Sequence, residues 1–179
     1  GDIGSHWCDL AQHVIGSPIV EVLADLATVV PIRYRPAVSP EAFSSTAGET
    51  REPFRVKSED LATIIVRFEN GARGSATIGQ VCAGHKNDLW IEVNAAEASL
   101  RWRQEQQNEL WIGRRDSANE VLAKDPSLMA AAARPYAHLP GGHQEGWPDA
   151  FANVIRDIYS FISEGRAPGD RRAPAFATF

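Results

Sequence analysis

The stretch that decides the fold is "LATIIVRFENGARGSATIGQV", residues 61–81. Two runs with strand patterns, "LATIIVRF" (61–68) and "ARGSATIGQV" (72–81), flank the segment "ENG", which contains Asn70 and Gly71. An Asn-Gly pair favours a tight turn with positive φ, and β-branched residues favour strands on both sides of it. The sequence therefore predicts an antiparallel hairpin here.

Strand patterns continue on the C-terminal side of the hairpin. The runs are "DLWIEVNA" (88–95), "ASLRWR" (98–103) and "ELWIG" (109–113). In the first run, Leu89, Ile91 and Val93 alternate with more polar positions, which is typical of a half-buried strand. Together with the hairpin, these runs predict one antiparallel sheet with a core face and a partly exposed face.

On the N-terminal side, "IVEVLADLATVV" (19–30) predicts a long strand, because it is rich in β-branched residues. Residues 35–59 carry Pro, Ser, Thr and charges without a period, so we expect a loop or meander there. Residues 117–134, "SANEVLAKDPSLMAAAAR", favour helix but are interrupted by Pro126.

Two helices are expected to back the sheet. The first lies in "SHWCDLAQHVIG" (5–16) and ends at Gly16-Ser17-Pro18. The second begins at Pro148 and ends at Gly165. Its apolar residues recur at helical spacing and should pack on the sheet: Phe151, Val154, Ile155, Ile158 and Ile162. The predicted fold class is α+β, with an open, mainly antiparallel β-sheet backed by helices.

Composition excludes several classes of function. The chain has 179 residues, enough for one domain, and a net charge of -5 with its 18 Lys and Arg scattered, which argues against nucleic acid as a partner. No apolar run approaches the roughly 20 residues that span a bilayer. Cys8 and Cys82 lack metal-type spacing, so reduced thiols and a cytoplasmic location are expected.

The chain also has features of a piece of a longer protein. It starts with Gly1 directly before a predicted helix, and its one methionine is Met129. We therefore expect an upstream region, and any signal peptide would belong to it.

The first helix carries an unusual polar stripe. His6, Asp9 and His13 occupy positions i, i+3 and i+7, which share one helix face. An apolar stripe runs beside it, made of Trp7, Leu10, Ala11 and Val14. Asp9 and His13 are i, i+4 neighbours, so the carboxylate can fix one imidazole tautomer and leave the other nitrogen as a general base. Two alternatives remain open: a surface pair that satisfies itself, and a metal site of His6, Asp9 and His13.

Two loops add candidate ligand contacts. His143 and Trp147 lie in "GGHQEGW" (141–147) just before a helix, where they suit a polyhydroxylated ligand; a helix-entry loop whose tryptophan packs on the core is the alternative. His85 and Lys86, in "GHKN", form either a second contact or a solvated turn. The sequence has no G-x-G-x-x-G, Walker or G-x-S-x-G motif, so we expect no nucleotide site in this chain.

Five phrases, in order along the chain, resemble one known family. They are "GDIGSHWCDLAQHVIG" (1–16), "VRFENGARGSATIGQ" (66–80), "LWIEVNAAEASLRW" (89–102), "NELWIG" (108–113) and "GGHQEGWPDAFANVIRDIY" (141–159). The family is that of the Gfo/Idh/MocA oxidoreductases, which includes glucose-fructose oxidoreductase and inositol dehydrogenase. Residues 1–179 resemble its C-terminal substrate-binding and oligomerisation domain, and a closing segment is expected after Phe179.

The resemblance implies a two-domain dehydrogenase whose N-terminal Rossmann domain, absent from this chain, binds most of the NAD or NADP. Asp9 and His13 match the family's aspartate and histidine, with His13 as the base; the lysine of a Glu-Lys-Pro motif belongs to the absent half. The implied substrate is a sugar, cyclitol or related polyol. We expect His143, Trp147, His6 and Lys86 to contact it. No metal is called for, and this chain alone should be inactive.

The family's open sheets also imply a homo-oligomer, a dimer or tetramer, formed through the sheet face. We expect Trp90 and Trp102 to contribute large aromatics to that face. Two rival functions remain open: a non-catalytic ligand-binding or assembly module of the same fold, and a metal-dependent hydrolase or isomerase that uses the polar stripe of the first helix.

Overall fold

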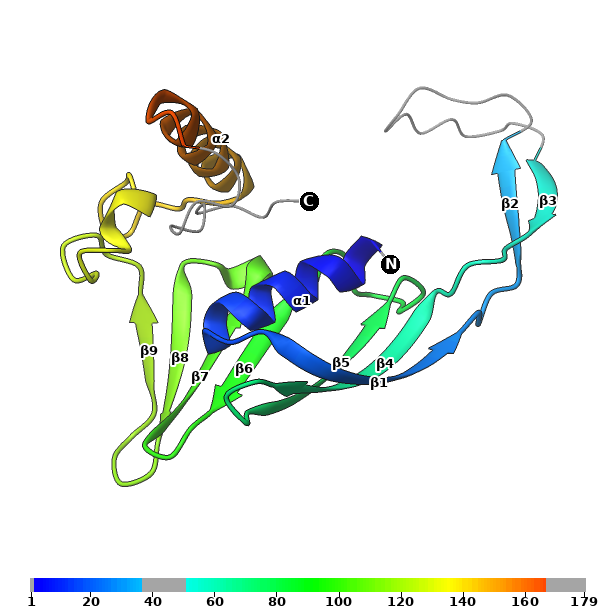
Figure 1. The fold of residues 1–179 in the computed structure, drawn as a ribbon, viewed down its shortest axis with the longest axis horizontal. Helices are drawn as coiled ribbons and strands as arrows, with labels where there is room; N and C mark the ends of the chain where they lie inside the picture. The colour runs from blue at the N-terminus through cyan, green and yellow to red at the C-terminus, as the bar shows by residue number, and fades with distance from the viewer. Residues whose placement is uncertain (1, 37–50, 167–179) are drawn as a thin grey trace. The chain divides into compact units, whose positions relative to one another are not determined.

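The computed structural model describes residues 2–36 and 51–166, which form an α+β fold of two α-helices and antiparallel, open sheets (Figure 1). The chain divides into an N-terminal unit, Gly1–His85, and a C-terminal unit, Lys86–Phe179. None of the helices in the described ranges is long and apolar enough to cross a membrane.

The hairpin organises the N-terminal unit as the sequence predicts. β4 (Leu61–Phe68) pairs antiparallel with β5 (Arg73–Gly79) through a turn where Gly71 has a φ of 88°. β1 (Ile19–Ala27) pairs with the other edge of β4, which gives the order β1-β4-β5. Side chains of the central strand alternate between exposed and buried, and the buried ones are Ile64, Val66 and Phe68. The predicted hairpin and the long first strand are confirmed, although β1 ends at Ala27.

Helix α1 (Asp2–Ile15) begins the same unit. It ends where Gly16 adopts a φ of 67° and the amides of Gly16 and Ser17 donate to the carbonyl of Gln12, a typical glycine C-cap. Ala11 is buried, while Trp7 and Leu10 are half-buried and Val14 is exposed. The predicted helix and its stop are confirmed, and its apolar stripe is covered only in part.

Residues 35–59, predicted as a loop or meander, contain a paired strand as well as irregular segments. β2 (Ile32–Pro36) pairs antiparallel with β3 (Arg51–Arg55) as a separate two-stranded sheet, while residues 37–50 lie outside the described residues. The sequence pattern does not predict these two strands, because neither strand has a buried face that would require alternating apolar residues.

A buried aspartate explains why β1 stops before β2 starts. The Asp60 carboxylate accepts hydrogen bonds from the backbone amides of Val29 (2.7 Å) and Val30 (3.0 Å) and from the guanidinium of Arg33 (3.1 Å). The amide hydrogen bond from Val29 holds the pKa of Asp60 below its usual value, burial opposes this, and Val30 and Arg33 lower it further. These contacts turn the chain out of the first sheet.

The C-terminal unit contains a second sheet with the order β6-β7-β8-β9. Its strands are β6 (Trp90–Asn94), β7 (Ala98–Arg103), β8 (Glu109–Arg114) and β9 (Glu120–Ala123). All pairs are antiparallel, and a 3-10 turn, η1 (Gln104–Gln106), lies between β7 and β8. The expected single sheet is therefore wrong, because the described strands form three separate hydrogen-bonded sheets.

The prediction of a helix within residues 117–134 is also wrong. Strand β9 forms there, because its backbone completes the edge of β8 and a tertiary ladder outweighs local helix propensity. The Asn119 side chain accepts a hydrogen bond from the Arg114 amide (3.0 Å) and closes the β8–β9 turn. Turns follow Pro126, and the next regular element is the short 3-10 helix η2 (Arg134–Tyr136).

The strand register separates the two tryptophans that we expected on one face. Trp90 lies opposite Arg103, whereas Trp102 lies opposite Ile91. Directly opposed residues share a face, so Trp102 is on the Ile91 side and the expected grouping is wrong. Trp111 lies opposite Arg101 and shares the Trp90 face instead.

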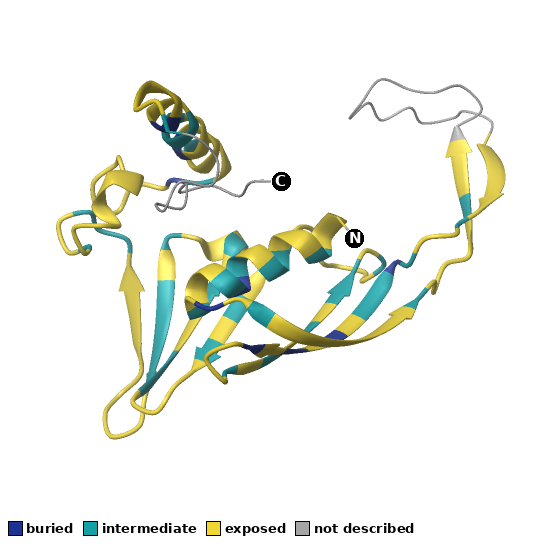
Figure 2. Ribbon diagram, in the orientation of Figure 1, coloured by how far each residue is buried: buried dark blue, intermediate teal, exposed yellow. Residues whose placement is uncertain are grey.

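Helix α2 (Trp147–Ser163) begins and ends as predicted, with Pro148 in its first turn and Gly165 at a φ of 64° after its end. Its packing does not match the prediction. Asn153 and Phe161 are the buried residues, while most of the apolar stripe is exposed and colours the helix largely yellow (Figure 2): Phe151, Val154, Ile155 and Ile162. Polar side-chain contacts, and not an apolar face packed on the sheet, hold this helix.

Candidate functional site

The polar stripe of α1 is exposed to solvent. His6, Asp9 and His13 are all exposed, and the His6 imidazole lies 3.9 Å from the Asp2 carboxylate. Neither the Asp9 nor the His13 side chain forms a hydrogen bond or ion pair with any other described residue. The structure thus brings the three residues to one helix face and leaves Asp9 and His13 open to a ligand, without the internal hydrogen bond that their spacing allows.

Among the described residues, no group of three or more His, Cys, Asp or Glu side chains converges in a way that could hold a metal ion. His6, Asp9 and His13 follow one another along the helix axis and do not surround a common point. The two cysteines, Cys8 and Cys82, are free thiols, and burial raises the pKa of Cys8.

The second candidate group lies in the C-terminal unit, in the loop that leads into α2. His143 is exposed, and its Nδ1 is 3.3 Å from the carbonyl of Gly141. Gly142 adopts a φ of 79°, which favours glycine at this bend. Trp147 begins the helix with 65% of its surface exposed and contacts Phe151 at a ring distance of 4.3 Å. Trp147 is therefore not packed in a core, as the alternative interpretation required.

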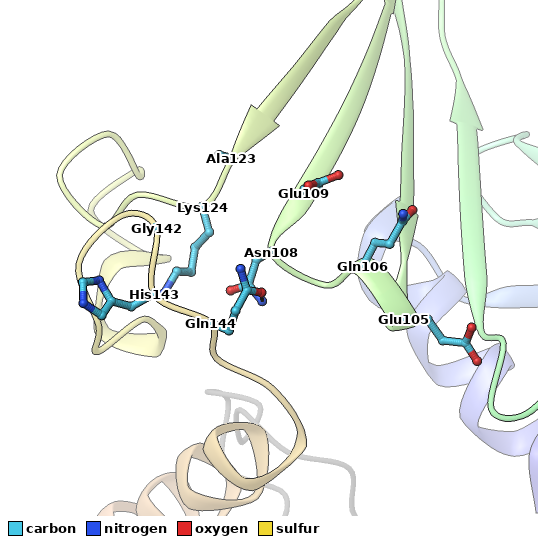
Figure 3. A pocket seen from close by; sticks show the side chains of 9 residues that line it. All are labelled: Glu105, Gln106, Asn108, Glu109, Ala123, Lys124, Gly142, His143 and Gln144. Carbon is cyan, nitrogen blue, oxygen red and sulfur yellow. Dashed lines mark hydrogen bonds between the residues drawn. The ribbon is translucent and has the colours of Figure 1, made fainter.

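A small open hollow lies beside His143, with a volume of about 220 Å³ (Figure 3). The end of the β8–β9 hairpin forms one side of it and the loop before α2 forms the other. Amide and carboxylate side chains dominate its lining, which includes Glu105, Gln106, Asn108, Glu109 and Gln144. Such groups offer several hydrogen-bond acceptors and donors to a hydroxylated ligand.

Buried polar contacts fix this loop against the sheet. Glu145 is buried and pairs with the Lys124 ammonium group, while its other carboxylate oxygen accepts from the His138 amide (2.6 Å). The Glu145 backbone is held as well, since Asn108 Nδ2 and Gln107 Nε2 both donate to its carbonyl (2.8 and 2.9 Å).

The charge state of Glu145 follows from these contacts. Burial alone would raise the pKa of the Glu145 carboxyl, but hydrogen bonds from Lys124 and from the His138 and Leu139 amides outweigh it and hold the pKa below its usual value. Glu145 is therefore ionised at neutral pH, as its pairing with Lys124 requires.

A second polar cluster anchors α2. Asn153 Oδ1 accepts from His138 Nε2 (2.8 Å) and from Arg156 Nη1 (2.9 Å), and Asn153 Nδ2 donates to the Tyr136 carbonyl (3.0 Å). The Arg156 guanidinium also lies over the Tyr136 ring at 4.8 Å and donates to the Pro135 carbonyl. These bonds tie the helix to η2.

The structure groups the sequence candidates by unit. His6, Asp9 and His13 lie on α1 of the N-terminal unit; Lys86, exposed after the hairpin, belongs with His143 and Trp147 to the C-terminal unit. Sequence patterns do not predict the residues of the polar network: Lys124, Glu145, His138 and Asn153. One signal was present, since Asn153 interrupts the apolar run of the second predicted helix and a polar residue at such a position needs a partner.

Comparison with known proteins gives a consistent result. A model of the GFO/IDH/MocA C-terminal domain matches residues 1–101. Levoglucosan dehydrogenase of Pseudarthrobacter phenanthrenivorans is 29% identical over 112 residues, which cover 63% of this chain and 28% of that protein.

Two solved structures share the fold. An oxidoreductase from Sinorhizobium meliloti has a TM-score of 0.74 and 27% identity, covering 94% of this chain and 43% of that one. An inositol dehydrogenase homolog from Azotobacter vinelandii, complexed with NADH and myo-inositol, has a TM-score of 0.73 and 22% identity, covering 92% and 39%. The chain thus spans less than half the length of these relatives.

Proposed function

This chain belongs to the GFO/IDH/MocA family, and from that membership we propose that it is the substrate-binding and oligomerisation part of an NAD(P)-dependent oxidoreductase. The proposed reaction transfers hydride between a sugar, cyclitol or related polyol and nicotinamide. The relatives support this substrate class, since one is a levoglucosan dehydrogenase and another is complexed with NADH and myo-inositol.

The observation that carries the proposal is the open polar stripe of α1. In the oxidative direction, a free nitrogen of His13 takes the proton of the substrate hydroxyl as the adjacent carbon gives up hydride. Asp9, one turn earlier on the same face, lies within reach of a side-chain rotation and would orient and polarise the protonated imidazole. Both groups are exposed and free of other described partners, as a base that must meet a substrate requires.

The cofactor belongs to another part of the protein. A bound nicotinamide supplies the acceptor of the hydride. The sequence has no G-x-G-x-x-G or Walker motif, so we assign none of its residues to the cofactor. His6, Lys86, His143 and Trp147 are proposed as substrate contacts, because each is exposed and offers a hydrogen bond or an apolar surface to a polyol.

Assembly is proposed through the exposed face of the β6–β9 sheet. Trp90 and Trp111 share this face, Arg101 stacks over Trp111 at 4.7 Å, and Val121 on β9 is exposed. Arg101 is also paired with Glu92 on this face (3.7 Å), and an apolar surface with paired charges suits an isologous contact between two copies. Sedimentation equilibrium of the 179-residue chain should give a dimer that Trp90→Glu dissociates; a monomer mass at tens of micromolar would contradict the proposal. The two free thiols favour a reducing compartment, and we propose the cytoplasm.

The test of the proposed function compares this chain with the full-length protein that contains it. Full-length protein should reduce NAD or NADP with a polyol such as myo-inositol or levoglucosan, while the isolated chain shows no turnover because it lacks the cofactor domain. Failure of the full-length protein to bind either cofactor would support the non-catalytic module instead. Metal-dependent activity abolished by a chelator would support the hydrolase or isomerase alternative.

A further inference from the structure

Glu145 is the one buried carboxylate among the described residues of the C-terminal unit. Its ionic partner, Lys124, follows β9 directly and is almost as buried. Lys124 has two further bonds: its ammonium group donates to the Leu139 carbonyl (3.1 Å), and its amide donates to the Asn108 carbonyl (2.7 Å). The pair therefore joins the end of the β8–β9 hairpin to both ends of the loop 139–145.

Short contacts restrict the same loop on each side of His143. A side chain at Gly141 would place its Cβ 3.0 Å from an Asp125 carboxylate oxygen, and one at Gly146 would place it 2.9 Å from Gln107 Nε2. The loop backbone thus lies close to the ends of two neighbouring side chains, and a side chain at either glycine would require that neighbour to shift. Between them, His143 Nδ1 lies 3.3 Å from the Gly141 carbonyl, and in the part of the chain that the structure describes His143 forms no hydrogen bond or ion pair with Lys124 or Glu145.

A loop without regular secondary structure has little of its own to fix a side chain in space. The bonds of Lys124 and Glu145 hold the loop in place of regular secondary structure. Removing either side chain leaves the other as an unpaired buried charge, which strongly destabilises this arrangement. A buried ion pair of this kind is a poor source of net stability, since desolvation offsets its attraction. The ion pair is better explained by the loop conformation that it fixes.

We infer that Lys124 and Glu145 are positioning residues, which hold the loop 139–146 so that His143 and Trp147 are presented to the substrate. Neither side chain is assigned a contact with the ligand. The consequence for substrate rests on the proposed function, while the consequence for loop order does not.

Amide hydrogen exchange of the 179-residue chain tests loop order directly. In Lys124→Met, the amides of 138–146 should exchange at least tenfold faster, with the amides of β4 and β5 unchanged. The matched control is Glu120→Gln, which breaks an exposed ion pair with Arg114 (3.4 Å) on the same two strands and should leave the loop unchanged. Unchanged exchange in Lys124→Met would overturn the inference.

A double variant separates positioning from simple loss of a charge. Lys124→Met with Glu145→Gln removes both charges at once and should protect the loop better than Lys124→Met alone, since no buried charge stays unpaired. If Lys124→Met does not fold, Asn108→Ala gives the milder test, because it removes two bonds to the Glu145 backbone and leaves the ion pair intact.

Kinetics of the full-length protein test the link to substrate. Lys124→Met should raise the KM for the polyol about tenfold, with kcat and cofactor KM within twofold and with the same pH profile. Faster loop exchange without a change in polyol KM would overturn the positioning role. A full-length protein that turns over no polyol would defeat the proposed function, and the exchange experiment would still decide whether the pair orders the loop.

Discussion

The α1 stripe and the loop before α2 present histidines in opposite ways. His13 is placed by a helix whose own backbone hydrogen bonds fix its Cβ, so its imidazole needs no other support and has none among the described residues. His143 lies on a loop, and a buried ion pair with several side-chain to backbone bonds does the same task. The difference teaches that a binding group on an irregular segment needs a network, and that the network shows where the segment must stay ordered.

The two regions should also differ in the kind of defect that a mutation causes. Loss of a base affects the chemical step, while loss of a binding contact affects the affinity for substrate.

The largest effect is expected for His13→Ala in the full-length protein. Removing a general base should lower kcat about 100-fold or more and leave cofactor affinity nearly unchanged. Steady-state kinetics and cofactor titration measure both quantities. His6→Ala is the matched control, since His6 lies on the same face but beside Asp2, and its kcat should stay within a few fold. A parallel loss of cofactor binding in His13→Ala would indicate a structural role instead.

A smaller and different effect is expected for His143→Ala. Loss of one hydrogen bond to a hydroxyl should raise the KM for the polyol about tenfold, with kcat nearly constant. Glu120→Gln is the control, since it breaks an exposed ion pair with Arg114 (3.4 Å) and lies outside the hollow. A fall in kcat as large as that of His13→Ala would remove the distinction between the two regions.

The sequence predicts α1, α2 and the hairpin well, because each has a local cause: a 3.6-residue period, a glycine stop, or the Asn70-Gly71 turn. It predicts β9 badly, because that strand depends on pairing with β8 and "NEVLA" has no strong strand pattern of its own. Residues 51–55 fail in the same way, since β3 depends on β2. The grouping of Trp90 with Trp102 required the strand register, which composition does not encode.

The same contrast between local and long-range causes applies to the candidate site. His6, Asp9 and His13 could be selected because helical spacing alone brings them together. Lys124 and Glu145 are separated by 21 residues, and Asn108 lies further still, so no local pattern relates them. Only the closure of the β8–β9 hairpin against the loop before α2 makes them neighbours.

Acid should destabilise both units through one buried carboxylate each. Asp60 and Glu145 have pKa values below their usual ones, so each proton binds less readily in the folded state than in the unfolded one. Their contribution to stability is fully present above the unfolded-state values of about 3.9 and 4.3 and is lost as the pH falls through the lower folded-state values. Thermal unfolding between pH 7 and pH 2 should show this loss.

Matched variants identify the carboxylates. Asp60→Asn and Glu145→Gln should each be less stable than the parent chain at pH 7 and should flatten its pH dependence below pH 4. The parent chain's five tryptophans help to locate the change, since Trp7 alone reports on the N-terminal unit. A pH dependence that stays as steep in both variants would show that other carboxylates govern acid unfolding.

The smallest effect is expected at the start of α2. The Gly146 amide donates to the Asp149 carboxylate (2.8 Å), and a negative charge in the first turn also complements the helix dipole. Asp149→Ala should therefore cost about 1 kcal/mol of helix stability. At α1, Asp2 has the dipole interaction and, within residues 2–36 and 51–166, a weak side-chain contact with His6, so Asp2→Ala should cost less. Urea unfolding of the 179-residue chain, followed by circular dichroism, gives both values.

Because the apolar stripe of α2 is exposed, this helix depends on its cap and on the Asn153 anchor more than α1 does on its own first turn. Equal losses in the two variants would mean that an apolar contact, and not the polar attachments, holds α2 in solution.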